Sequence, residues 1–164
     1  MANWTNARLV VVGRRADVLA FSKSARRSLE YFPREMRVSE GGELSSGRIR
    51  SPSGSKLSEK TYSFQFARVD PMAQFRRVSR RHERCWFIVA YSDPCWPESN
   101  TSLIRAGRCE SFSMPAEVQA HFCGRVGFNP GSERFRDDLC WQAEDAIMDD
   151  CVERWRRKIP GWRK

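Results

Sequence analysis

Histidine and cysteine side chains stand close together at two places in the sequence. His82 precedes Cys85 by three residues, and His121 precedes Cys123 by two. Together they could supply four ligands of the kinds that zinc accepts. The spacing is not that of a zinc finger, and cysteine is also among the most buried residue types. We therefore expect buried thiols, with no metal and no cofactor.

The same residues could in principle form a nucleophilic pair, because a catalytic cysteine needs a histidine beside it. His121 and Cys123 would not face each other on a helix, although they would on a strand. The sequence offers no oxyanion loop and no third group to orient the histidine. We favour a structural role for both.

Acidic residues crowd one segment near the end of the chain. Asp145 and Asp149 are spaced to lie on one helix face, and such a pair can hold Mg²⁺ for nuclease chemistry. A run of this kind is more often a solvated helix face. We expect no enzymatic activity, with a metal-dependent nuclease as the less favoured alternative.

Arginine is the strongest chemical feature. The formal net charge is +9, and 24 of the 29 basic residues are arginine, whose planar fork suits phosphate and carboxylate. The candidate partner-binding residues lie after the first strand, on a short helix and near the C-terminus: Arg14, Arg15, Arg76, Arg77, Arg80, Arg81, Arg154, Arg156, Arg157, Lys158 and Trp162.

Each of these three groups has a specific rationale. Arg14 and Arg15 follow Gly13 between a strand and a helix, where a helix N-terminus favours anions, although a lone glycine matches no nucleotide-binding loop. The four arginines from 76 to 81 repeat at helical spacing, so their mutual repulsion would be relieved by an anionic partner. The C-terminal cations alternate with aromatic residues, as in proteins that bind single strands.

The elements that must position these residues alternate between strand and helix patterns. Strands are expected at 8–13, 62–66, 85–91 and 103–112, the last as one strand or a bent pair around Gly107. Helices are expected from Asp17 to Phe32, from Pro71 to about Arg81, near 116–122, and from about Glu133 to Lys158. Residues 39–60 have the composition of a loop, with a short edge strand around 48–50.

This order predicts an α+β protein with a ferredoxin-like split βαβ antiparallel sheet, helices on one face and a long C-terminal helix. We expect residues 1–125 to form that domain, with the flexible loop at 39–60. Residues 126–164 would form a helical extension packed on it.

The opening Met1-Ala2-Asn3-Trp4, followed by a strand and Gly13, resembles the YubB-type proteins of plasmids and phages. The aromatic strand 62–66, the proline-initiated helix 71–79 and the strand 87–91 are similar too. The chain departs from that pattern at 68–70, which lacks the tryptophan before the proline, and at 93–97. The resemblance implies a ferredoxin-like fold and a mobile-element setting, and the family has no assigned activity to transfer.

No apolar run reaches the roughly 20 residues of a membrane span, and the N-terminus has no signal-peptide pattern. We expect a cytoplasmic, non-enzymatic accessory protein of a mobile element that acts by binding and occlusion. The expected target is a nucleic-acid-binding host complex, as in anti-CRISPR counter-defence. Direct DNA or RNA binding is the alternative, and the oligomeric state is left open.

Overall fold

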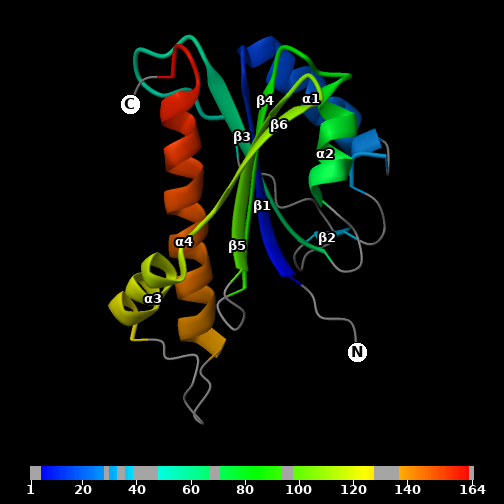
Figure 1. Ribbon diagram of the computed structural model, residues 1–164. Coiled ribbons are helices and arrows are strands. Elements are labelled where there is room, and N and C mark those ends of the chain that lie inside the picture. Colours follow the sequence, from blue (N-terminus) through cyan, green and yellow to red (C-terminus); the bar gives the residue numbers. More distant parts are fainter. Residues whose placement is uncertain are drawn as a thin grey trace.

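The computed structural model describes residues 5–27, 30–32, 36–38, 48–66, 71–93, 98–127 and 137–162 (Figure 1). The elements are β1 (Thr5–Gly13), α1 (Arg15–Arg27), β2 (Met36–Val38), β3 (Ser58–Phe66), α2 (Pro71–Ser79), β4 (Trp86–Asp93), β5 (Glu98–Arg105), β6 (Arg108–Ser113), α3 (Ala116–Arg125) and α4 (Asp137–Lys158).

The strands form one antiparallel sheet in the order β2-β3-β1-β4-β5-β6, which confirms the α+β antiparallel class. Helix α1 joins β1 to β2 across β3, and α2 joins β3 to β4 across β1. Two β-α-β units are therefore interleaved. The bent pair around Gly107 is confirmed as the β5–β6 hairpin.

Both faces of the sheet are covered, and Figure 1 shows α1 and α2 on one side with α4 on the other. The central strand β1 reflects this arrangement, since Leu9 and Val11 enter the core under α1 and α2 while Val10 and Val12 enter the core under α4. All four side chains are fully buried. A continuous β-branched run suits such a strand because neither face meets water.

Helix α4 presents the expected apolar face, with Met148, Val152, Trp155 and Ile159 packed on the sheet. Its end at Lys158 is confirmed. The side chain of Trp141, also expected on that face, lies outside the described residues, as do residues 133–136 at the expected start of the helix.

Several boundaries differ from the sequence expectation. Helix α1 runs from Arg15 to Arg27, so Phe32, expected on its stripe, lies in a turn beyond it and is buried in the core. Strand β3 begins at Ser58, so residues 58–60, which were expected in the loop, belong to this strand. At the expected edge strand around 48–50, Arg50 forms an isolated bridge with Glu59. Residues 39–47 lie outside the described part. No helix in the described ranges combines the length and apolarity needed to cross a membrane.

Candidate polyanion-binding surface

The C-terminal cations are neutralised within the protein. Each has a carboxylate partner: Arg154 with Asp150 at 2.6 Å, Arg156 with Glu59 at 2.7 Å, Arg157 with Glu153 at 3.7 Å and Lys158 with Glu110 at 2.7 Å. Trp162, expected to be free, is half-buried against the core under α4, with Arg156 over its ring. The Arg154 and Arg157 pairs lie within α4, whereas the Arg156 and Lys158 pairs join α4 to β3 and β6.

The arginines of α2 are exposed but do not form a free helical stripe. Helix α2 ends at Ser79, so Arg80 and Arg81 lie in the following turn. Arg77 donates a hydrogen bond to Gln74 Oε1 at 2.8 Å. Arg81 pairs with Glu30, and the hydrogen bond and charge of its guanidinium lower the pKa of that carboxyl.

Arg76 and Arg80 contact the tip of the β5–β6 hairpin. The tip is a two-residue turn, Ala106-Gly107, in which both φ angles are positive, as type I′ hairpin turns require. Arg76 Nε donates to Gly107 O at 3.1 Å, and Gly107 N donates to Ser79 Oγ at 2.9 Å. The Arg80 side chain lies so close to Gly107 that a Cβ there would meet Arg80 Nε at 2.6 Å. The hairpin tip is thus fixed against α2.

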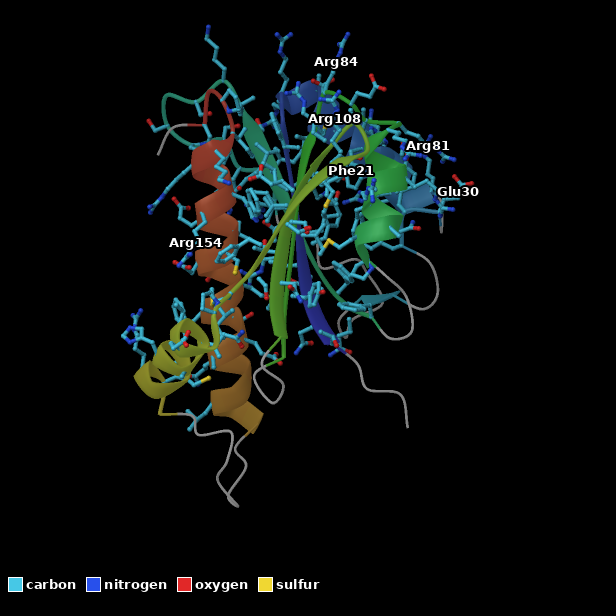
Figure 2. All side chains as sticks on the ribbon, viewed as in Figure 1. Phe21, Glu30, Arg81, Arg84, Arg108 and Arg154 are labelled. Atoms are coloured by element: carbon cyan, nitrogen blue, oxygen red, sulfur yellow. The ribbon has the colours of Figure 1, made fainter. Side chains whose placement is uncertain are left out.

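These contacts gather arginines at one end of the sheet, where β1 ends, β4 begins and the hairpin turns. We call this surface the basic end: Arg14, Arg15, Arg80, Arg84, Arg105 and Arg108. All six are exposed, and in the described part of the chain none has a carboxylate within ion-pair distance. The acidic side chains that line the same clefts are Asp17 and Glu83. Figure 2 shows Arg84 and Arg108 together at this end and Arg154 away from them on α4.

A cleft of about 500 Å³ opens on the basic end between Arg14, Arg84 and Arg105. Trp86 forms part of its wall, and the Arg105 guanidinium lies over the Trp86 ring at 4.4 Å from the centroid. Arg105 Nε also donates to the Glu83 carbonyl oxygen at 3.3 Å. The ring and the carbonyl orient this guanidinium without cancelling its charge.

Gly13 explains how Arg14 reaches the cleft. A Cβ at Gly13 would lie 3.3 Å from Cys85 Sγ and 3.4 Å from the Arg84 carbonyl oxygen. Only glycine fits this approach comfortably, so the end of β1 lies directly against the start of β4. Arg14 and Arg84 consequently lie beside each other. The expected position of Arg14 and Arg15 between a strand and a helix is confirmed, since β1 ends at Gly13 and α1 begins at Arg15.

The acidic pair on α4 holds an arginine. Arg8 on β1 pairs with Asp145 at 3.1 Å and with Asp149. Within the described ranges, no group of three or more His, Cys, Asp or Glu side chains is arranged to hold a metal ion. The pair thus acts as a clasp between α4 and the central strand.

The histidines and cysteines are dispersed. His82 Nε2 lies 2.8 Å from the Tyr31 hydroxyl, and burial together with the Arg81 charge lowers the His82 pKa. Burial raises the pKa of the Cys85 thiol to about 12. On α3, His121 is exposed while Cys123 is buried, so the two side chains have different surroundings.

Sequence reasoning missed Arg84, Arg105, Arg108 and Trp86 as members of one surface. The segment Arg105-Ala106-Gly107-Arg108 does carry a usable pattern, namely two arginines flanking a two-residue turn. What the sequence does not contain is the contact that brings this turn against α2 and the start of β4.

No family model matches this chain, no curated protein matches its sequence, and no solved structure matches its fold. Function is therefore inferred from the surface itself.

Proposed function

We propose that the protein is a non-enzymatic binding module whose basic end contacts the phosphate groups of nucleic acid. The observation that carries the proposal is a contrast within one molecule. The cations near the C-terminus have carboxylate partners, whereas the six arginines of the basic end have none among the described residues. Charge left unneutralised at one end is available to a polyanion.

Physical chemistry favours phosphate as the counterpart. Arginine presents a planar fork of donors that fits two phosphate oxygens at once. Neighbouring guanidinium groups repel each other, and a phosphate between them replaces that repulsion with attraction. Binding would also release counterions from the nucleic acid, which gives the interaction a strong dependence on salt.

The finer description of the fold is part of the same proposal. We infer that β1 to β4 with α1 and α2 form a ferredoxin-like unit, a reading supported by the interleaved order of those strands. On this view the β5–β6 hairpin, α3 and α4 are additions. The division at residue 125 stays a prediction.

The resemblance to YubB-type proteins supports a cytoplasmic role in a mobile element. There the basic end would occlude a nucleic-acid-binding host complex by contacting its bound DNA or RNA. If the protein inhibits the complex in this way, inhibition depends on the same arginines as binding to free nucleic acid. If inhibition survives their loss, the contact is made through another, protein-binding surface.

Fluorescence anisotropy with labelled DNA and RNA tests the proposal. One variant replaces Arg14, Arg84 and Arg105 with Gln. A control variant of equal charge replaces Arg154, Arg157 and Lys158 with Gln. We expect the first to weaken binding roughly tenfold or more and the control to have little effect. Equal losses in both variants, or no binding by the wild-type protein, would overturn the proposal.

The non-enzymatic part has its own measurement. Labelled oligonucleotides incubated with the protein and Mg²⁺ or Mn²⁺ should remain uncut. Cleavage that disappears in an Asp145→Asn, Asp149→Asn variant would instead assign a metal-dependent nuclease to the acidic pair of α4.

A further inference from the structure

The cleft on the basic end combines positive charge with an aromatic wall. Its lining includes Arg14, Arg84 and Arg105 together with Trp86, and its other apolar contributions come from Leu57 and Pro160. Among the described residues of the lining, Asp17 is the one acidic side chain. A surface that bound duplex backbone alone would need the cations and not the ring.

Arg105 and Trp86 form a cation–π pair, which we call the platform. The guanidinium lies over the ring at 4.4 Å from its centroid, and its Nε is held by the Glu83 carbonyl. In the described part of the chain, the two terminal nitrogens of this guanidinium have no hydrogen-bond partner. Nucleic acid bases stack on arginine planes as well as on aromatic rings, so a base can stack on the face of the Arg105 guanidinium that points away from the Trp86 ring.

We propose that the cleft takes one unit of single-stranded nucleic acid, with its phosphate between the arginines and its base stacked on the Trp86–Arg105 platform. This rests on the proposed function and adds to it a preference for single strands. In a duplex the bases are stacked on each other and their faces are not available to the platform. A single strand can turn one base into the cleft.

The molecule contains a matched control for the platform. Trp162 is also half-buried against the core under α4 and also has an arginine over its ring, Arg156 at 5.5 Å. Arg156, however, is neutralised by Glu59 and Glu153. Replacing either tryptophan by leucine removes a ring with similar packing, but only Trp86 adjoins unneutralised arginines.

The experiment measures anisotropy with three probes of equal length: a single strand of about ten nucleotides, the same strand with abasic residues, and the duplex of that strand with its complement. We expect Trp86→Leu to weaken binding of the intact single strand about tenfold more than binding of the other two probes, which lose only the orienting contact of the ring with Arg105. Trp162→Leu should leave all three unchanged. Thermal melting identifies any variant that fails to fold.

Arg105→Lys provides a second variant, since this exposed residue keeps its charge and loses its plane. It should weaken binding of the intact single strand several-fold more than it weakens binding of the duplex, because the duplex loses only the bidentate phosphate contact. If Trp86→Leu and Arg105→Lys leave single-strand binding unchanged, or weaken intact and abasic strands equally, the platform is refuted while phosphate binding by the basic end stands. If the arginine-to-glutamine triple variant binds every probe like wild type, the proposed function itself fails.

Discussion

The Ala106-Gly107 turn allows a sharp test of how the hairpin tip is held. Ala106 has φ +48° and Gly107 has φ +79°. A left-handed conformation costs a residue with a Cβ about 1–2 kcal/mol, whereas asparagine tolerates it and is favoured before glycine in type I′ turns. Ala106→Asn should therefore raise the free energy of unfolding by about 1 kcal/mol.

The neighbouring substitution should act in the opposite direction. Gly107→Ala places a Cβ in the same left-handed region and 2.6 Å from Arg80 Nε, so the Arg80 side chain must move. That side chain is exposed and can yield, so most of the cost comes from the backbone, and we expect a loss of about 2 kcal/mol.

Urea denaturation of the two variants and the wild-type protein measures both effects. The midpoints should move in opposite directions while the dependence on urea concentration stays constant, since neither change alters the surface exposed on unfolding. Destabilisation by Ala106→Asn, or a neutral Gly107→Ala, would refute this reading of the turn. Gly107→Ala should also weaken nucleic acid binding because it displaces Arg80.

Two further outcomes follow from buried groups. The His82 pKa is lowered from 6.5, so the unfolded chain binds the extra proton first, and the urea midpoint should fall as the pH drops below 6.5, less steeply in His82→Gln. Iodoacetamide should label half-buried Cys109 before Cys85, whose thiol pKa is raised to about 12; the reverse order would contradict the burial.

The sequence predicted those parts of the fold whose pattern is local. Strand β1 and helix α4 carry long apolar runs or stripes, and Pro71 marks the start of α2. Strand β2 was missed because three residues are too short for a periodicity to be recognised. Helix α2 was expected to continue to Arg81, but it ends at Ser79, whose hydroxyl binds the backbone of Gly107 from a distant part of the chain.

The candidate site was predictable only in part, for a similar reason. The pairing of Asp150 with Arg154 follows from their spacing on a helix, whereas Glu59 and Glu110 lie 97 and 48 residues from the cations they neutralise. Counting charges along the chain therefore overestimated the positive charge that the C-terminal cluster leaves available to a partner. It likewise gave no reason to place Arg105 and Arg14 on one surface, because only the fold of the hairpin and the end of β1 brings them to the same cleft.

The most direct test is the salt dependence of nucleic acid binding. For a duplex, the logarithm of the affinity falls with the logarithm of salt concentration by about 0.9 for each phosphate contact. The Arg14, Arg84, Arg105→Gln variant should lose about 2 to 3 units of this slope between about 50 and 200 mM salt, and the Arg154, Arg157, Lys158→Gln variant less than about one unit. Equal slopes in the wild-type protein and the basic-end variant would show that these arginines do not bind phosphate.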